Sequence, residues 1–342
     1  MPNTETITLE TPLDMHLHLR DGEMLRRIAR YSAESFSGAI IMPNLVPPVT
    51  TKEAVVAYKR RIFEAIGESS FSPYMTLFFK PSYDRAFLES VRDEITAIKL
   101  YPAGITTNSE GGVNGFDIEE LRPALEAMSD LNIPLCIHGE TNGFVMDREA
   151  QFVPIYEKLA NAFPKLKIIM EHITTKESVA ALERFDNLYA TITVHHLYIT
   201  LDDVAGGMLQ PHLFCKPIAK RPEDREALLK VALEAHPKVM FGSDSAPHPK
   251  EAKEACGCAA GVFTSPIALQ LLAQLFSDNR ASVANLQAFV SDNAKRIYNI
   301  TPPTKRVVLE KKSFMVPSDY DGVVPMFANE TIDFSLKEVT DG

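Results

Sequence analysis

The sequence predicts an α/β fold, a (β/α)8 or TIM barrel with a short C-terminal extension, and three observations lead to this prediction. Short apolar runs rich in Ile, Val and Leu alternate with segments of helical period, which is the pattern of repeated βα units and a parallel sheet. About eight such runs can be distinguished, the number that closes a barrel of this class. Potential metal ligands follow several of these runs, and the strand ends of such barrels carry their active sites.

The predicted strands are short and rich in apolar residues. In chain order they are residues 12–17, 39–42, 74–79, 97–101, 134–138, 167–172, 189–194 and 239–243.

Amphipathic segments between the strands predict the helices, for example residues 51–66, 117–128, 175–185 and 222–235. Asp117 places acidic residues in a first helical turn, and Pro222 is a favoured residue at a helix start. Two further segments of helical period, residues 265–276 and 282–298, follow the last strand.

No Gly/Ser-rich or Pro-rich linker and no internal repeat divides the chain. We therefore expect one domain over residues 1–342, with the barrel core at residues 11–300 and an extension at residues 301–342. Within the extension, residues 306–309 and 314–317 are expected to form short β pieces.

Composition excludes several classes of protein. The chain has 342 residues, of which 45% are hydrophobic and 23% charged, as in an ordinary globular protein rather than a disordered one. The formal net charge is -10, from 35 basic and 45 acidic residues. Because no basic cluster is longer than residues 59–61, a nucleic-acid partner is not expected.

The N-terminus lacks a basic and apolar leader, and no run approaches the ~18 to 20 apolar residues of a membrane span. We expect a cytoplasmic protein that does not bind membranes. The 4 cysteines are too few for a disulfide framework, and Cys256 and Cys258 lack a second pair that would complete a cysteine-rich zinc site. Free thiols are therefore expected.

His16 and His18 end the first predicted strand. Since side chains on a strand alternate between its faces, both imidazoles point the same way. Converging imidazoles suit a divalent metal, although two buried histidines bonded to the backbone would have the same spacing. The pair becomes more informative because Lys99, His138 and His172 also end predicted strands.

Asp244 follows the eighth predicted strand, so candidate ligands gather at one end of the expected barrel. Taken singly, His138 or His172 could be a satisfied buried histidine, and Asp244 a helix or loop cap. Lys99 is expected to point into the barrel, where burial and nearby cations favour its neutral amine. Such an amine can react with carbon dioxide to give a carbamate that bridges two metals, although pairing with an inward acid is the alternative.

Six motifs together resemble the amidohydrolase superfamily and, within it, the dihydroorotases of the shorter, single-function bacterial (class II) type. The resemblance covers nearly the whole chain. The motifs are DMHLHLR at 14–20, MPNL at 42–45, KLYPAG at 99–104, IHGE at 137–140, EHIT at 171–174 and GSDSAPH at 242–248.

This resemblance implies a site with two divalent metal ions. His16, His18 and Asp244 would hold one ion, His138 and His172 the other, and Lys99 would bridge them as N6-carboxylysine formed with carbon dioxide. Zinc is the metal that the resemblance implies, although these ligands also accept cobalt or manganese.

The resemblance also implies the reaction, which is the reversible cyclisation of N-carbamoyl-L-aspartate to L-dihydroorotate and water in de novo pyrimidine biosynthesis. In this binuclear mechanism, a metal-activated hydroxide attacks the scissile amide of the ring. Asp244 would carry the proton between the attacking oxygen and the leaving nitrogen.

The implied substrate is a small anion and needs fixed donors. Arg20, two residues after His18, suits a bidentate carboxylate contact, and a surface arginine is its alternative interpretation. The resemblance implies that Asn44, His138 and His248 also bind substrate, with backbone groups near Lys216 and Ser265 completing the pocket. At these last two positions the chain departs from the family, which carries small apolar residues there.

Residues 104–109 form a polar loop after Lys99 that suits a mobile lid, with the hydroxyls of Thr106 and Thr107 donating to substrate. An ordinary barrel loop is the alternative. His195 and His196 are expected to end the seventh strand, where a structural role or one supporting the metal ligands is expected rather than a catalytic one. Cys136 is expected to pack below the site.

Two other functions stay open at this point. A hydantoinase shares the two-metal site but prefers neutral rings, and Arg20, Asn44 and His248 argue for an acidic substrate instead. A non-catalytic barrel that serves as an assembly partner is disfavoured, because all six candidate ligands are intact. The family suggests a homodimer.

Overall fold

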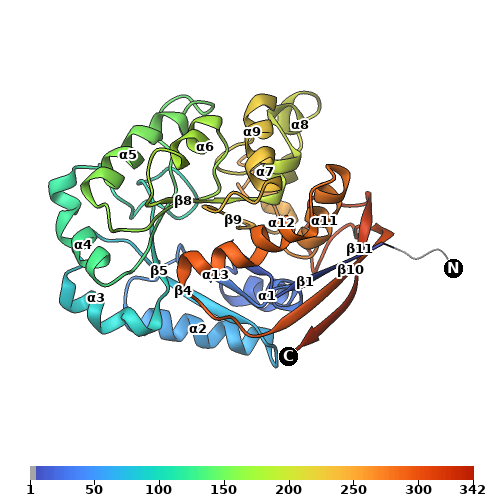
Figure 1. Ribbon diagram of the computed structural model, residues 1–342, viewed down its shortest axis with the longest axis horizontal. Helices are drawn as coiled ribbons and strands as arrows, with labels where there is room; N and C mark the ends of the chain where they lie inside the picture. The colour runs from blue at the N-terminus through green and yellow to red at the C-terminus, as the bar shows by residue number, and fades with distance from the viewer. Residues whose placement is uncertain (1–4) are drawn as a thin grey trace.

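Eight parallel strands form the central sheet of the computed structural model, which describes residues 5–342 (Figure 1). They pair in chain order from β2 to β9. Each overlaps one predicted strand, so the predicted barrel class is confirmed. The strands are β2 (Leu13–Leu17), β3 (Gly38–Ile41), β4 (Ser72–Phe78), β5 (Ala97–Leu100), β6 (Leu135–Ile137), β7 (Ile168–Met170), β8 (Leu188–Ile192) and β9 (Val239–Phe241).

Hydrogen bonds between β2 and the residues after β9 close the sheet into a barrel. The amide of Asp244 donates to the carbonyl oxygen of His16 at 2.8 Å. The buried carboxylate of Asp14 accepts from the amide of Ser243 at 2.7 Å and from its hydroxyl at 2.5 Å. The closure therefore brings two predicted metal ligands, His16 and Asp244, into direct contact through the backbone.

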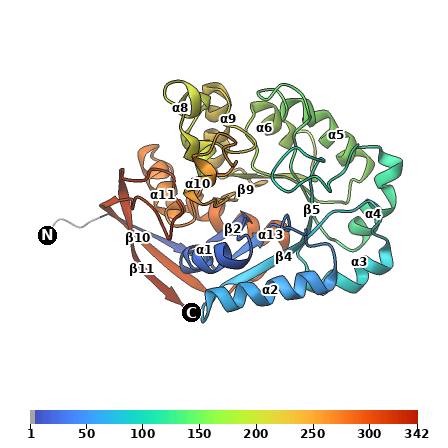
Figure 2. The ribbon, with the colours of Figure 1, turned by 180° about the vertical axis from the view of Figure 1, so that it is seen from behind.

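Helices α2, α3, α4, α5 and α6 follow one another around the outside of the barrel (Figures 1 and 2). Side chains cap the starts of two of these helices: the hydroxyl of Thr51 accepts from the amide of Ala54, and the carboxylate of Asp117 accepts from the amide of Glu119. The helices are α1 (Gly22–Ser35), α2 (Lys52–Ile66), α3 (Arg85–Val91), α4 (Ile118–Asp130), α5 (Val153–Ala162), α6 (Lys176–Leu182), α7 (Val194–Tyr198), α8 (Leu201–Ala205), α9 (Pro222–Leu233), α10 (Lys250–Lys253), α11 (Ala268–Asp278), α12 (Val283–Gln287) and α13 (Asn293–Tyr298).

Two predicted segments are interrupted. The helix predicted over residues 282–298 contains a π-helical turn, η4 (Ala288–Asp292), between α12 and α13. The strand predicted over residues 189–194 ends at Ile192, so His195 and His196 lie in the short helix α7 and not at a strand end. Thr193 starts this helix, because its hydroxyl accepts from the amide of His196 at 3.1 Å.

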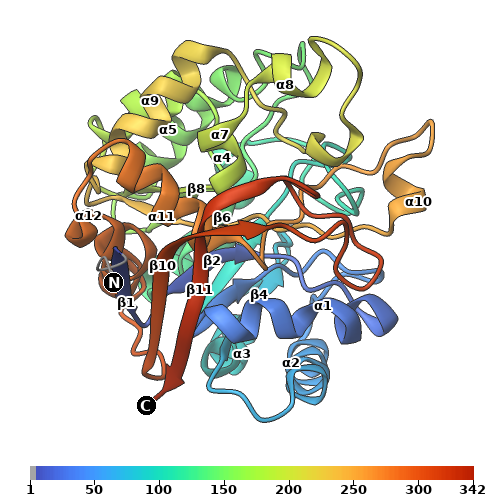
Figure 3. The same ribbon diagram turned by 90° about the vertical axis from the view of Figure 1, so that its right-hand side faces the viewer.

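The C-terminal segment forms more β structure than the two short pieces predicted from the sequence. Strand β10 (Lys305–Met315) is continuous and pairs antiparallel with β1 (Thr6–Glu10) and β11 (Thr331–Asp341). Figure 3 shows β10 and β11 side by side. The two ends of the chain thus share one small sheet, which local sequence patterns do not reveal. The division into barrel core and extension stays a prediction.

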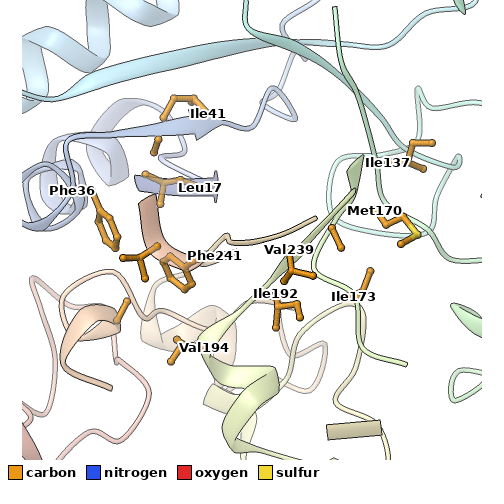
Figure 4. Close-up of a cluster of buried hydrophobic side chains, with 14 of the residues drawn as sticks. Leu17, Phe36, Ile41, Ile137, Met170, Ile173, Ile192, Val194, Val239 and Phe241 are labelled. Atoms are coloured by element: carbon orange, nitrogen blue, oxygen red, sulfur yellow. The ribbon is translucent and has the colours of Figure 1, made fainter. Parts of the chain in front are cut away.

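Apolar side chains fill the barrel below its C-terminal rim. Ala97 and Cys136 precede Lys99 and His138 by two positions and so share their inward face. Sγ of Cys136 lies 3.3 Å from the hydroxyl of Tyr298 in α13, which agrees with the expected packing below the site. A second, larger cluster packs between the strands and the surrounding helices (Figure 4). The rim is therefore the polar end of an otherwise filled cylinder.

Within residues 5–342, no helix combines the length and the apolar character that crossing a membrane requires.

Candidate metal centre

His16, His18 and Asp244 bring three ligand atoms together at the C-terminal rim of the barrel. Nε2 of His18 lies 3.1 Å from Oδ1 of Asp244, and Nε2 of His16 lies 3.5 Å from the same oxygen. All three residues are buried, and their ligand atoms lie within 4.8 Å of one another. Since zinc binds nitrogen and oxygen at about 2.0–2.2 Å, tetrahedral ligands of one ion lie about 3.3 Å apart. The spacing therefore fits a single divalent ion.

Strand β2 is irregular where it carries these histidines. Its register against β3 shifts between Asp14 and Leu17. Register shifts of this kind re-aim side chains and are frequent next to active sites. The irregularity lies at the segment that carries His16.

Lys99 is the third residue of β5, next to its last residue, and its side chain is fully buried. Its Nζ has no hydrogen-bond partner among the described residues, and it lies 5.0 Å from the centre of the Tyr101 ring. Burial lowers the pKa of the ammonium group, against the opposing charges of Glu171 and Asp244. The neutral amine is thereby favoured, and this is the form that can react with carbon dioxide.

His138 and His172 extend the group of imidazoles. The ring of His172 lies 4.8 Å, centre to centre, from the rings of both His16 and His138. Nε2 of His138 lies 2.7 Å from Oε2 of Glu140, which leaves Nδ1 as its free ligand atom. Nδ1 of His172 is buried and has no partner within the described part of the chain.

The electrostatics also fit a metal centre. Burial lowers the pKa values of His16, His18 and His172, so each imidazole is neutral and offers a lone pair. Neutral imidazoles, one carboxylate and an unpartnered amine are an unfavourable core on their own, because buried polar atoms need partners. Divalent cations such as Zn²⁺ are suitable partners for this set of ligands.

Three of the predicted site residues adopt left-handed backbone conformations. The φ angles of Arg20, His172 and Asp244 are 57°, 40° and 42°. Such values are uncommon for residues other than glycine, and they cluster at functional sites where the surrounding structure holds them. Arg20, His172 and Asp244 follow β2, β7 and β9, and this backbone conformation turns the chain at the rim just after each strand.

Arg20 lies beside the metal-ligand group and contacts the segment after Asp244. Its Nε donates to the carbonyl oxygen of Pro247 at 3.1 Å, and its Nη2 lies 3.0 Å from Nε2 of His248. The hydroxyl of Tyr58 donates to the carbonyl oxygen of Arg20 at 2.7 Å. The guanidinium is therefore held in place and is not a mobile surface group.

The loop at residues 104–109 lies over the same cavity. Nδ2 of Asn44 donates to the carbonyl oxygen of Thr107 at 3.0 Å, and Nδ2 of Asn108 donates back to the carbonyl oxygen of Asn44 at 3.1 Å. Nζ of Lys216 donates to the carbonyl oxygen of Ile105 at 3.2 Å. The loop is thus fastened to two sides of the barrel mouth.

The cavity at the rim includes most of the predicted site residues, but not Ser265, which is buried with its amide 3.1 Å from the Ser245 hydroxyl. His248 is also absent from the lining. Its Nε2 lies 3.0 Å from the carbonyl oxygen of Ala260, which is part of the cavity wall. The lining consists of His16, His18, Arg20, Asn44, Tyr101, Thr106, Thr107, His138, His172, Lys216, Asp244, Ala246, Ala260 and Gly261.

Several site residues were not identified from the sequence. Ala260 and Gly261 line the cavity where Ser265 was expected, and a Cβ on Gly261 would lie 2.3 Å from the Ala246 carbonyl oxygen. Glu171 and Glu140 contact the imidazoles of predicted ligands. In the sequence, Glu171 is next to His172 and Glu140 follows His138 by two residues. These positions do not reveal which imidazole each glutamate contacts.

Comparison with known proteins identifies the family and supports the fold. The model of the amidohydrolase family matches residues 12–304. The chain is 44% identical to a dihydroorotase of Helicobacter hepaticus over 98% of both chains. It is 58% identical to a solved dihydroorotase of Campylobacter jejuni, with a TM-score of 0.94 and 99% of both chains covered. A Saccharomyces cerevisiae dihydroorotase solved with 5-fluoroorotic acid is 34% identical, with a TM-score of 0.91 over 97% of this chain and 98% of that one.

More distant structures share only the fold. An L-hydantoinase from Arthrobacter aurescens is 16% identical, with a TM-score of 0.83 over 98% of this chain and 84% of that one. An inactive dihydroorotase-like domain from Chaetomium thermophilum is 19% identical, with a TM-score of 0.71 over 98% of this chain and 93% of that one. Since the same barrel occurs in all of them, the fold alone does not indicate the substrate or even activity.

Proposed function

The chain belongs to the amidohydrolase family, and we propose that it acts as a dihydroorotase, interconverting N-carbamoyl-L-aspartate and L-dihydroorotate with release or uptake of water. The observation that carries this proposal is identity of 42–44% to curated dihydroorotases over nearly the full length. The six candidate ligands of the sequence analysis are all present and buried at the rim. The reaction is a step of de novo pyrimidine biosynthesis.

The enzyme is a metal-dependent hydrolase, and we propose that it uses two divalent ions, both Zn²⁺. One ion is assigned to His16, His18 and Asp244, and the other to His138 and His172. When bound, such ions polarise an amide carbonyl and make water nucleophilic at neutral pH. The spacing of the first three ligands and the neutral state of the imidazoles support this assignment.

Lys99 is assigned as the bridging ligand in the form of N6-carboxylysine. Its neutral Nζ attacks carbon dioxide, an N–C bond forms, and one proton leaves to solvent. The product carries two oxygens and a negative charge where the ammonium was disfavoured. The support for this step is the complete burial of Lys99 and the absence of a partner for Nζ among residues 5–342.

Asp244 is assigned as the group that moves the proton. In ring opening, its carboxylate accepts a proton from the attacking water and passes it to the ring nitrogen as the amide bond breaks. In ring closure, the same carboxylate accepts a proton from the carbamoyl nitrogen and returns it to the departing oxygen. Burial raises the pKa of Asp244, although His16 and His138 oppose that effect, and a higher pKa favours a group that must gain and lose a proton.

The substrate carboxylates are assigned to Arg20 and Asn44, which line the cavity, and to His248, which contacts Arg20 behind the cavity wall. Arg20 is the one arginine in the cavity lining of the described residues, and a guanidinium binds a carboxylate through two parallel hydrogen bonds. The hydroxyls of Thr106 and Thr107 and the imidazole of His138 are assigned as further contacts. Lys216 lines the cavity and is assigned to contribute backbone groups, whereas Ser265 is buried outside the lining and its contact with substrate stays a prediction.

The cell location and assembly state are part of the same proposal. We place the enzyme in the cytoplasm, where it needs a small anionic substrate and neither nucleic acid nor a membrane. A homodimer is the assembly that the family suggests, and light scattering of the purified protein measures it.

One experiment tests the function as a whole. Ring opening of L-dihydroorotate is followed by ultraviolet absorbance on a sample whose metal content is measured before and after chelation. We expect turnover that disappears with the chelated metal and returns with Zn²⁺. Faster opening of a simple hydantoin would favour the hydantoinase alternative, and bound metal without turnover of either ring would favour a non-catalytic barrel.

A further inference from the structure

A second group of buried metal-ligand side chains lies outside the centre described above. It consists of His195 and His196 in α7 and Cys215, which follows the 3-10 turn η3 (Pro211–Leu213). One ligand atom from each residue lies within 4.8 Å of the other two. None of the three has a role in the proposed reaction.

His195 is a buried imidazole without a protein partner. Its exposed fraction is 0%, and neither Nδ1 nor Nε2 has a hydrogen-bond partner within residues 5–342. A neutral imidazole has one N–H donor and one lone pair, so both of its polar atoms are unsatisfied here. Buried polar atoms are seldom left in this state, and each exception needs a physical explanation.

His196 and Cys215 have the separation of two ligands of one zinc ion. Sγ of Cys215 lies 3.5 Å from Nε2 of His196. Zinc binds thiolate sulfur at about 2.3 Å and imidazole nitrogen at about 2.0–2.1 Å, which at a tetrahedral angle places the two atoms about 3.5 Å apart. The carbonyl oxygen of Pro217 lies 3.0 Å from Nε2 of His196 and 3.2 Å from Sγ of Cys215. An oxygen ligand therefore faces the same point.

The second nitrogen of His196 is held as in many metal-binding histidines. Nδ1 lies 2.9 Å from the hydroxyl of Thr193, at the start of α7, while Nε2 faces Cys215. A hydrogen bond to the outer ring nitrogen fixes the orientation of a metal-binding imidazole and its tautomer. Thr193 provides this contact without any contribution from the catalytic centre.

The charge states of the three groups are compatible with a cation. Burial lowers the pKa of His196 to about 4 and that of His195 well below its usual value, so both imidazoles are neutral near pH 7. Burial raises the pKa of the Cys215 thiol to about 12, so its sulfur is protonated without a cation. On binding, the thiol proton leaves to solvent and the electron pair of the S–H bond forms the bond to the metal.

We propose that His195, His196 and Cys215 bind one Zn²⁺ ion at a site separate from the catalytic centre. The carbonyl oxygen of Pro217 is the fourth protein atom at this point, so the set is closed to water, as in structural and not in catalytic zinc sites. A mixed nitrogen and sulfur set selects zinc over the oxygen-preferring Mg²⁺ and Ca²⁺. The ion ties α7 to the segment of Cys215, whose neighbour Lys216 lines the catalytic cavity.

Cobalt substitution provides a test that does not depend on activity. The ligands assigned to the catalytic centre are nitrogen and oxygen atoms, so a thiolate-to-cobalt charge-transfer band in the Co²⁺-loaded holoenzyme reports a cysteine ligand. We expect this band in the native sequence and in a Lys99→Ala variant. We expect its loss, with the loss of one metal equivalent per chain, in Cys215→Ser and in His195→Gln.

The control is a Cys256→Ser/Cys258→Ser double variant, because these two free cysteines are exposed or half-buried and could bind cobalt adventitiously. This variant should keep the band. Absence of the band from the native sequence, or its loss only in the double variant, would overturn the proposal even if Cys215→Ser failed to fold. Activity of the native protein without the band would leave the proposed function intact and reject the second site alone.

Discussion

Nδ1 of His16 lies 2.7 Å from Oε2 of Glu171, a buried carboxylate 155 residues further along the chain. The hydroxyl of Thr191 donates to the same oxygen at 2.6 Å. Burial alone would raise the pKa of Glu171, but the hydrogen bonds with His16 and Thr191 hold it below its usual value. An ionised Glu171 therefore fixes the His16 ring so that Nε2 faces Asp244.

Replacing Glu171 with glutamine should weaken metal binding. The side chain keeps its size but loses the negative charge that orients and polarises His16, and such changes typically reduce metal affinity about 10–100-fold. Competition with a chelator, followed by metal analysis, measures the change. Glu68→Gln is the control, because Glu68 is exposed. An unchanged affinity in Glu171→Gln would show that its charge does not support the centre.

Lys99→Ala should lose at least one metal ion and most of the activity. The substitution removes the amine from which the carbamate would form, together with the bridge between the two ions. A short carboxylic acid added to the variant should restore part of the activity, because its two oxygens can replace those of the carbamate. Unchanged metal content would argue against a bridging role, and Lys158→Ala, at an exposed position, is the matched control.

Arg20→Met should reduce kcat/KM for dihydroorotate by at least about tenfold, which corresponds to ~1.4 kcal/mol of lost transition-state stabilisation. The physical reason is the loss of the positive charge next to the assigned carboxylate position. Steady-state kinetics measure the change, with Arg26→Met on the exposed face of α1 as the control. Kinetics close to those of the native sequence would remove Arg20 from the substrate contacts.

Lys253→Met should loosen the cavity wall that contains Ala260. Nζ of Lys253 donates hydrogen bonds to three backbone carbonyl oxygens, that of Phe214 at 2.9 Å and those of Ala259 and Gly261 at 2.7 Å. It thus joins two loops that border the cavity. Because the substitution leaves buried carbonyl oxygens without a donor, at a cost of about 1–3 kcal/mol each, we expect a measurable loss of unfolding free energy.

The kinetic signature of Lys253→Met should be a raised KM with a smaller change in kcat, since this wall lines the cavity and holds no proposed metal ligand. Denaturant unfolding and steady-state kinetics on the same preparation separate the two effects. Lys250→Met, at an exposed position in the same helix, should change neither. A raised KM without any loss of stability, or the reverse, would contradict the proposed role of Lys253.

Local sequence patterns were sufficient to predict the barrel and to place the candidate metal ligands at its rim. The alternation of apolar runs with helical segments predicted all eight strands, and each predicted end lies within two residues of the observed end. Because parallel strands of a barrel end at the same rim, His16, Lys99 and His138 could be placed together before any contact was known. This inference needs only the end of each strand, which local residues define.

Contacts between distant segments were decided by the tertiary structure alone. The pairing of Glu171 with His16, the contacts of Lys253, and the group formed by His195 and Cys215 join residues that no local period relates. The same holds for the small sheet of β1, β10 and β11, where the strand partners come from opposite ends of the chain. Secondary-structure signals depend on neighbours within a few residues, whereas these contacts arise only when closure of the barrel and packing of its loops set distances across the molecule.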